Sequence, residues 1–205
     1  MSSENIKNVV FDIGNVVVRW APLEIARLTF GDSPSIEDKA KSIFQSDIWL
    51  NLNKGLLSEN SAKAQYQEVL GLTELECERL FYYVKQTQIL IYGSVELLRR
   101  CKSAGYHVFA LTDNVHEIVS HLKASYSFWD LFEGAIVSAE VGLLKPQPEI
   151  YELLLSQYGL KASETVFIDD MPYNVEGAES VAIKAIQFES AAQCEKALKS
   201  LGVQC

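Results

Sequence analysis

The amino-acid sequence predicts an α/β protein, a doubly wound (Rossmann-like) parallel sheet with an inserted helical cap. After about residue 90, short apolar segments alternate with segments of helical periodicity, an order typical of a parallel sheet covered by helices on both faces. A strand-like segment at 7–12 is separated from this alternating part by a long stretch without a convincing strand. The expected division is therefore a core of residues 1–15 and 91–205 and a cap of residues 16–90.

The first element, residues 7–12, is short, rich in β-branched residues and free of polar alternation. This pattern is typical of a strand buried on both faces of a parallel sheet. The segment ends in Asp12, and a charged side chain at the end of a buried strand is costly unless it has a function. Asp12 is therefore a candidate functional residue, with helix N-capping as its alternative role.

The inserted stretch shows signals of helix ends. Residues 22–87 have a helical pattern, and "SIED" at Ser35–Asp38 and "TELE" at Thr73–Glu76 fit capping boxes that begin helices. Gly71 follows "YQEVL" and suits a helix C-cap. We therefore expect several short helices here and no strand.

The remaining elements alternate between helix and strand as far as the last helix. Pro148 and Gly159 suit the first and last positions of one of the helices. The expected helices span 94–106, 115–126, 148–159, 174–181 and 190–201, and the expected strands span 107–112, 134–139, 165–170 and 182–188.

Composition and charge narrow the class of protein. The 205 residues are 48% hydrophobic, enough for a sizeable core, and the net charge of −9 argues against a general nucleic-acid binder. The N-terminus lacks a secretory pattern, and no apolar run reaches the roughly 20 residues of a membrane span. Four scattered cysteines without a CxxC motif indicate free thiols in a reducing compartment. We expect a cytoplasmic protein without a nucleic-acid or membrane partner; its oligomeric state stays open.

Three of the expected strands end in residues that carry chemistry. Asp12 ends the first strand, Thr112 ends the strand at 107–112, and the pair Asp169 and Asp170 ends the strand at 165–170. Lys145 lies in the loop after the strand at 134–139, and Asp113 follows Thr112 directly. Because ligands bind outside the carboxyl ends of the strands in an open parallel sheet, these side chains are expected to converge.

Carboxylates gathered at one point repel each other, and a divalent cation removes that cost. Oxygen ligands without histidine or cysteine favour a hard ion, which we expect to be Mg²⁺. Such a cation beside one lysine and one hydroxyl suits a phosphoryl group, with a central aspartate as nucleophile. The expected ligand is therefore a small phosphorylated molecule.

Four motifs in this order resemble those of the haloacid dehalogenase (HAD) superfamily, over nearly the whole chain. They read "VVFDIGNVVV", "ALTDN", "LKPQPEIY" and "VFIDDMPYN". The insertion directly after the first motif is similar to the type 1 cap of that superfamily. The details "DIGNV" and "FIDD…N" look most like the subgroup of bacterial glucose-1-phosphate phosphatases and the N-terminal phosphatase domain of soluble epoxide hydrolases.

The resemblance implies a role for each matching residue. Asp12 would be the nucleophile and a metal ligand, and the backbone carbonyl of Gly14 would be a second ligand. Asp170 would ligate the cation, with Asp169 supporting it directly or through water. Asn174 occupies the place of a partner that supports these ligands.

The same resemblance implies a phosphate site. Thr112 and the backbone of Asp113 would hold phosphate oxygens. Lys145 would neutralise charge on Asp12 and on the phosphoryl group. For Thr112 and Lys145, the alternatives are the end of a strand and an ordinary solvated loop lysine.

Gly14 departs from the pattern that the resemblance implies. Phosphatases of this superfamily usually carry an aspartate there, which protonates the leaving alcohol and then activates water. Gly14 offers a carbonyl to a metal but no proton. Leaving groups that need little protonation, such as those of sugar 1-phosphates, acyl phosphates and aryl phosphates, are therefore expected to be favoured.

The expected function is a Mg²⁺-dependent phosphatase that acts through an aspartyl-phosphate on a small phosphorylated metabolite. One alternative is a 2-haloacid dehalogenase, whose halide leaving group needs no acid but leaves the pair Asp169 and Asp170 unexplained. A second alternative is a non-catalytic protein that binds a phosphorylated ligand or a protein partner as a regulator.

Further features of the insertion have two interpretations each. Trp20 lies at the first of two expected hinges, near 15–20 and 88–93, and either touches the substrate or packs within the hinge. Gly55 belongs either to a cap loop facing the site or to a simple turn. The aromatic run 81–83 is expected in the cap core rather than at a binding surface.

Overall fold

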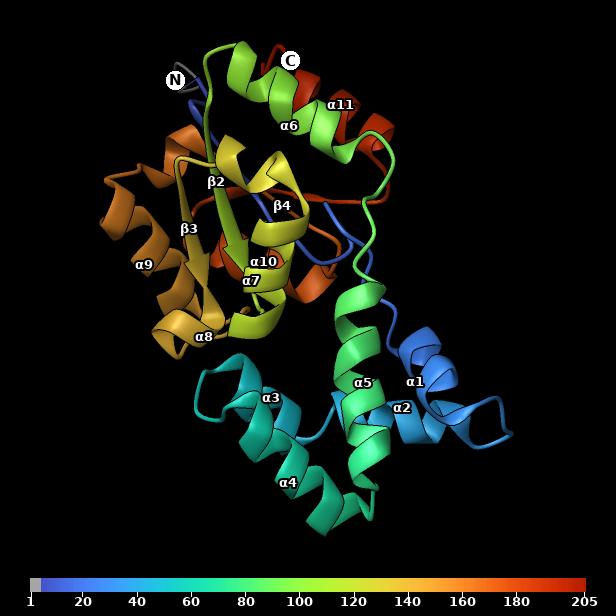
Figure 1. Ribbon diagram of the computed structural model, residues 1–205. Coiled ribbons are helices and arrows are strands. Elements are labelled where there is room, and N and C mark those ends of the chain that lie inside the picture. Colours follow the sequence, from blue (N-terminus) through green and yellow to red (C-terminus); the bar gives the residue numbers. More distant parts are fainter. Residues whose placement is uncertain (1–4) are drawn as a thin grey trace.

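The computed structural model describes residues 5–205 and contains one sheet of five parallel strands (Figure 1). Their order across the sheet is β3-β2-β1-β4-β5. The predicted doubly wound parallel fold is confirmed. The strands span β1 (Asn8–Phe11), β2 (His107–Thr112), β3 (Gly134–Val137), β4 (Thr165–Asp169) and β5 (Lys184–Gln187).

Strand β1 lies at the centre of the sheet because it pairs with β2 on one side and with β4 on the other. Val9 is in register with Val108 of β2 and with Val166 of β4. Each residue of β1 is buried, which explains why its sequence shows no polar alternation. The central position puts Asp12, the next residue, in the middle of the carboxyl edge.

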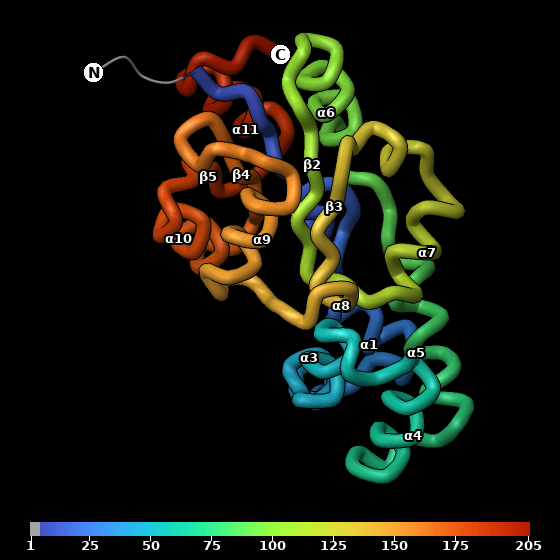
Figure 2. The backbone as a smooth tube through the Cα atoms, turned by 90° about the vertical axis from the view of Figure 1, so that its left-hand side faces the viewer, coloured from blue at the N-terminus to red at the C-terminus, as the bar shows by residue number. Residues whose placement is uncertain are grey.

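Helices cover both faces of the sheet. Alternate strand residues such as Val9 and Phe11 pack with α6 (Ser94–Ser103), α7 (His116–Ser125) and α11 (Ala191–Ser200), while Val10 packs with α9 and α10 on the other face. Figure 2 shows α7 and α10 on opposite sides of the sheet. The remaining elements of the core are η1 (Ser127–Leu131), α8 (Ser138–Val141), α9 (Pro148–Tyr158), η2 (Ala162–Glu164) and α10 (Pro172–Ser180).

The insertion consists of helices that lie beyond the carboxyl ends of the strands (Figure 1). Two chain segments connect it to the core, and they pair with each other: the backbone N–H of Arg19 donates to Ile89, and that of Ile91 donates to Val17. The helices share an apolar core that is continuous with one face of the sheet. They are α1 (Pro22–Phe30), α2 (Ile36–Phe44), α3 (Asp47–Asn53), α4 (Glu59–Leu70) and α5 (Glu74–Gln86).

The helix-end predictions for the insertion are partly right. Thr73 and Glu76 form the expected capping box at the start of α5, and Gly71 ends α4 in the left-handed conformation. The capping box predicted at Ser35 is wrong, because the Ser35 side chain makes no capping hydrogen bond. The backbone of Ser35 has ψ near 8° instead of the extended value, and an extended residue is what directs a capping oxygen toward the first turn.

Other boundaries differ by a few residues from those predicted. Strand β3 ends at Val137, and Ser138 begins the short helix α8, so the strand expected over 134–139 is too long. Of the aromatic run 81–83, Phe81 is buried as expected, whereas Tyr82 is half exposed. The cysteines are free thiols, in agreement with the prediction. Over residues 5–205, none of the helices is both long and apolar enough to span a membrane.

Candidate active site

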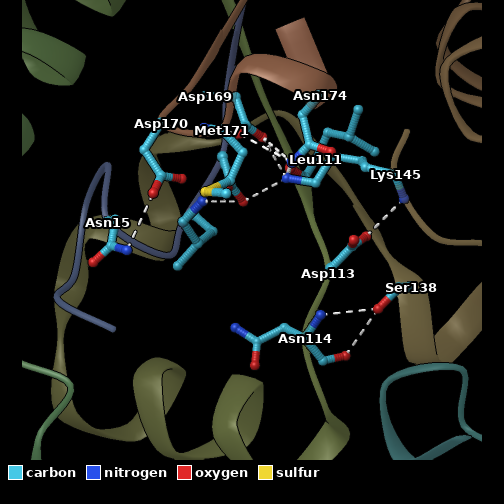
Figure 3. Close-up of polar contacts among 12 residues, drawn as sticks. Asn15, Leu111, Asp113, Asn114, Ser138, Lys145, Asp169, Asp170, Met171 and Asn174 are labelled. Carbon is cyan, nitrogen blue, oxygen red and sulfur yellow. Dashed lines mark hydrogen bonds and ion pairs between the residues drawn. The ribbon is translucent and has the colours of Figure 1, made fainter. Parts of the chain in front are cut away.

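The predicted site residues converge at the carboxyl edge of the sheet, where Figure 3 shows Asp113, Lys145, Asp169, Asp170 and Asn174. Asp12 directly follows β1, Thr112 ends β2, and Asp169 ends β4 with Asp170 next to it. Lys145 reaches the same place from the loop between α8 and α9. Parallel strands bring residues that are far apart in sequence to one edge, which is why reading the strand ends located this cluster.

Lys145 lies between two buried carboxylates. Its Nζ is 3.0 Å from Oδ1 of Asp12 and 2.7 Å from Oδ2 of Asp169, and its side chain is 1% exposed. Burial alone would lower the pKa of Lys145, but the charges of Asp12 and Asp169 outweigh it and raise that pKa. Lys145 is therefore a permanent cation held beside Asp12, not a solvated loop lysine.

Asp169 is fully occupied by hydrogen bonds. Besides Lys145, its Oδ1 accepts the backbone N–H of Met171 at 2.8 Å, and the Asn174 side-chain amide donates to Oδ1 and Oδ2 at 3.0 and 3.1 Å. The Asp169 side chain is completely buried. Asn174 thus has the supporting position expected from the sequence, and Asp169 fixes Lys145 in place.

Asp170 differs from its neighbour because it lines the cavity at the site. Its Oδ2 accepts a hydrogen bond of 3.1 Å from the side chain of Asn15, whose Oδ1 accepts the backbone N–H of Trp20 at 2.9 Å. Asn15 was missed by sequence reasoning. Its φ of 52° is in the left-handed region, which asparagine tolerates better than most residues, and an asparagine beside Gly14 was the signal that could have located this turn.

Three carboxylates form a group suited to a cation. Oxygen atoms of Asp12, Asp169 and Asp170 all lie within 4.8 Å of one another. Burial raises the pKa of Asp12 well above its ordinary value, against the opposing charge of Lys145, and burial also raises the pKa of Asp170. A cluster of hard oxygen donors whose negative charges are costly to bury fits Mg²⁺.

The predicted phosphate-binding segment lies beside Lys145. The Thr112 hydroxyl is buried and, among the described residues, has no hydrogen-bond partner. The Asp113 side chain accepts the backbone N–H of Lys145 at 3.1 Å, so it holds the lysine loop. The next residue, Asn114, donates its backbone N–H to Ser138 at 2.9 Å. Ser138 was also missed, because its contact with Asn114 joins segments far apart in the sequence and leaves no local pattern.

Gly14 lies at the edge of the same cavity. A Cβ atom at this position would meet only the Cβ of Trp20, at 3.9 Å, and the backbone is outside the left-handed region. The absence of a side chain at residue 14 is therefore not required by packing or by backbone conformation.

A cavity of about 710 Å³ separates the carboxylates from the insertion. Its core side is formed by residues of the site, including Asp12, Asp113, Lys145 and Asp170. Its other side is formed by residues of the first hinge and of α1, α2 and α3. The cavity volume lies in the range of small-molecule sites.

The sequence of residues 6–182 matches the family of haloacid dehalogenase-like hydrolases. The chain is 27% identical to the sesquiterpene phosphatase AstK of Aspergillus oryzae, over 96% of this chain and 97% of that protein. It is also 27% identical to a D-ribitol-5-phosphate phosphatase of Bacteroides thetaiotaomicron, with 94% and 97% covered. A HAD family enzyme of the same bacterium, solved with magnesium and inorganic phosphate, superposes with a TM-score of 0.75 at 22% identity, covering 91% of this chain and 96% of that one.

The fold and the family match define the chain as a hydrolase built on a parallel α/β sheet, with its candidate site at the carboxyl edge of that sheet. The chain belongs to the haloacid dehalogenase-like hydrolase family. The predicted membership of the superfamily is confirmed, and these relatives agree with the predicted class of enzyme, a phosphatase of this family.

Proposed function

We propose that the protein hydrolyses a phosphate monoester through an aspartyl-phosphate intermediate on Asp12, with Mg²⁺ as cofactor. The observation that carries this proposal is the placement of Asp12 between Lys145, at 3.0 Å, and the acidic group that it forms with Asp169 and Asp170. Asp12 thus lies between a fixed cation, the Lys145 ammonium, and carboxylate oxygens that suit a metal ion.

Asp12 is the proposed nucleophile. Its Oδ1 accepts the backbone N–H of Ile13 at 2.7 Å and faces Lys145, so we assign the attack on phosphorus to Oδ2. The new Oδ2–P bond forms as the bond from phosphorus to the leaving oxygen breaks, and that oxygen keeps the electron pair and takes a proton from water. Water then attacks phosphorus and gives up a proton to solvent while the Oδ2–P bond breaks, which releases inorganic phosphate and restores the Asp12 carboxylate.

Asp12, Asp170 and the carbonyl of residue 14 are the groups that would hold Mg²⁺. When bound, the ion supplies positive charge that offsets the phosphate and carboxylate charges. Asp169 acts indirectly, because both of its oxygens already accept hydrogen bonds. Asp169 holds Lys145 in place and adds negative charge close to the proposed Mg²⁺ position.

Thr112, the backbone of Asp113 and Lys145 would bind the phosphate oxygens. The buried Thr112 hydroxyl has a free hydrogen-bonding capacity among the described residues, and a buried polar group without a partner is costly until a ligand satisfies it. This observation favours the phosphate role of Thr112 over that of a simple strand end.

Two relatives support the reaction class rather than one substrate. They are a sesquiterpene phosphatase and a D-ribitol-5-phosphate phosphatase, and the molecules in these two names are chemically different. We therefore assign the shared step, phosphate ester hydrolysis, to this chain. The lack of a side-chain acid at Gly14 favours good leaving groups, such as those of aryl phosphates and sugar 1-phosphates.

The test of activity is hydrolysis of p-nitrophenyl phosphate with Mg²⁺ and with a chelator. We expect phosphate release that requires Mg²⁺ and is lost in Asp12→Asn, while Asp32→Asn, which changes an exposed carboxylate of the insertion, retains it. Activity that survives the chelator or Asp12→Asn would refute the mechanism. Chloride release from 2-chloropropionate, without phosphatase activity, would instead establish the dehalogenase alternative.

Metal binding has a readout that does not depend on turnover. An ion that binds only the folded protein raises the melting temperature, so we expect Mg²⁺ to stabilise the wild type. Asp170→Asn removes a carboxylate charge from the proposed site and should abolish most of this shift, whereas Asp32→Asn should leave it intact. An unchanged shift in Asp170→Asn would show that Mg²⁺ binds elsewhere.

A further inference from the structure

The two sides of the active-site cavity differ in chemistry. The core side carries the carboxylates and Lys145, whereas the side formed by the hinge and insertion is mostly apolar. The apolar residues of that side are Trp20, Pro22, Leu23, Ala40, Phe44, Trp49 and Leu50. We refer to this set as the apolar wall.

The centre of the apolar wall is a packed aromatic cluster. The rings of Trp20 and Trp49 stack with their centroids 5.5 Å apart, and Phe44 meets them edge-on at 5.3 and 5.1 Å. Such contacts hold the rings in a fixed arrangement. A rigid aromatic surface that lines a cavity offers contact to an apolar ligand without a large loss of side-chain entropy.

The aromatic cluster is linked to the charged site by one short path. The backbone N–H of Trp20 donates to Asn15 at 2.9 Å, and the same Asn15 side chain donates to Asp170 at 3.1 Å. The apolar wall therefore begins directly beside the proposed metal and phosphate positions. A ligand whose phosphate lies at Asp12 would place its remaining atoms against this wall.

The polar residues on the insertion side offer little to a second polar group of a ligand. The side-chain amides of Asn53 and Gln88 donate to backbone carbonyls of their own helical turns, at 2.8 and 3.1 Å. Glu37 and Lys41 are exposed on α2, and Gln45 is exposed directly after it. The cation that the insertion adds to the described part of the cavity lining is Lys41, and it is exposed to solvent rather than buried within the apolar wall.

We infer that the substrate is a phosphate monoester with a hydrophobic leaving group, of the aryl kind that Gly14 favours, whose apolar part packs against Trp20, Phe44, Trp49 and Leu50. This inference rests on the proposed phosphatase function for the position of the phosphate. It adds that the insertion selects its ligand by apolar burial and not by hydrogen bonds or a second charge. A cavity of about 710 Å³ has room for a sizeable apolar group beyond the phosphate.

Alkylphosphonates test this inference without turnover, because their carbon–phosphorus bond is not hydrolysed by the proposed mechanism. Affinity for ethyl-, butyl-, hexyl- and octylphosphonate is measured by titration calorimetry in Mg²⁺. We expect affinity to rise roughly fourfold per methylene, the gain typical of a CH₂ group leaving water. A phosphonate with a hexyl-length chain that ends in a carboxylate should bind more weakly than hexylphosphonate.

A pair of leucines provides matched variants. Leu50 lines the cavity and is 43% exposed, whereas Leu28 of α1 is 44% exposed and lies outside the lining. Leu50→Asn is expected to lower affinity for octylphosphonate about tenfold and to leave ethylphosphonate binding unchanged. Leu28→Asn should match the wild type for both ligands, and its stability reports on the general cost of such a change.

The outcomes separate this inference from the proposed function. Affinity that does not grow with chain length, or that falls equally in both leucine variants, overturns the hydrophobic-substrate inference. If p-nitrophenyl phosphate is still hydrolysed in that case, the phosphatase function stands. If affinity grows with chain length but no phosphate ester is hydrolysed, the apolar wall binds ligands as inferred and the proposed catalysis fails.

Discussion

Lys145 shows how one residue serves both the fold and the site. It lies within 3.0 Å of Asp12 and 2.7 Å of Asp169, and all three side chains are almost completely buried. Burying charges is costly, and their mutual attraction repays this cost only when each group has its partner. Burial raises the pKa of Asp12, and Lys145 opposes that rise by favouring the charged carboxylate.

Replacing Lys145 with methionine is expected to lower the free energy of unfolding by about 3–5 kcal/mol at neutral pH, because two carboxylates stay buried without a cation. The pKa of Asp12, already raised by burial, would lose the opposing effect of Lys145 and rise further. A carboxyl pKa that is higher in the folded than in the unfolded state costs stability as the pH rises from the unfolded value to the folded one, so the deficit should shrink as the pH falls through that range.

The measurement is urea unfolding in a chelator at several pH values. Lys199→Met is the control, because Lys199 forms an exposed ion pair with Glu195 and such pairs contribute about 1 kcal/mol or less. Equal losses in the two variants, or a loss in Lys145→Met that does not vary with pH, would contradict this explanation.

Gly14 permits a direct test of the missing acid. A Cβ fits at this position, 3.9 Å from Trp20, so Gly14→Asp should fold. If the native enzyme lacks a side-chain acid, this variant should hydrolyse simple alkyl phosphates at least about tenfold faster, a modest share of what general acids contribute. Hydrolysis of p-nitrophenyl phosphate should change much less, because its leaving group needs little protonation.

The control for this prediction is Gly14→Asn, which has a similar size and no carboxyl group. Steady-state rates on both substrate types would be compared with the wild type. If Gly14→Asn accelerates alkyl phosphate hydrolysis as well, the gain arises from contact and not from proton transfer. If neither variant accelerates it, another group already supplies the proton.

The sequence located most of the site at this scale because the end of a parallel strand determines where its side chain lies. That rule predicts the positions of Asp12, Thr112, Asp169 and Asp170. The family motif predicts that of Lys145. Neither predicts those of Asn15 and Ser138, because their partners, Asp170 and Asn114, lie 155 and 24 residues away. Contacts between separate loops depend on how the whole chain folds.

At the scale of elements, two similar sequence signals had different outcomes. Thr73 forms a capping box with Glu76, whereas Ser35 makes no capping bond at the start of α2. Both segments have a hydroxyl residue followed three positions later by an acidic residue. Ser35, however, follows Pro34, and the backbone of Ser35 is not extended. Backbone conformation, which a four-residue pattern does not specify, decides whether a cap forms.

Thr73→Ala is therefore expected to lower the free energy of unfolding by about 1 kcal/mol, the typical loss for an N-cap. Ser35→Ala should change it by no more than about 0.5 kcal/mol, because no capping bond is lost. Chemical denaturation of both variants under one condition makes the comparison. A larger loss for Ser35→Ala than for Thr73→Ala would contradict the assignment of the caps.

At the scale of the whole molecule, the insertion touches the core close to the site. The Ser138 hydroxyl donates to the backbone carbonyl of Asn53 at 2.7 Å and accepts the backbone N–H of Asn114 at 2.9 Å. Asn53 ends α3, and Asn114 lies two residues after Thr112. Ser138 thus connects the insertion with the predicted phosphate-binding segment.

Gly55 lies in the same contact. A Cβ atom there would be 2.1 Å from the carbonyl oxygen of Ala139, which is backbone and cannot give way. Gly55 was predicted to lie either in a cap loop facing the site or in a simple turn. It lies in a turn between helices, and this turn packs against α8 of the core. We interpret this close approach as what lets the insertion close over the cavity and exclude water.

Gly55→Ala is accordingly expected to push the loop after α3 away from α8 and to lower kcat/KM on phosphate esters by tenfold or more. Gly71→Ala is the matched control, since Gly71 has a similar φ, 65° against 68°, and a Cβ there meets no atom within 4 Å. Both variants incur the strain of a left-handed alanine, about 1–2 kcal/mol, but only Gly55→Ala meets the core. Hydrogen exchange should therefore increase in α3 and α8 of Gly55→Ala alone. If the two variants lose activity equally, backbone strain is sufficient to explain Gly55, and closure of the insertion does not depend on this contact.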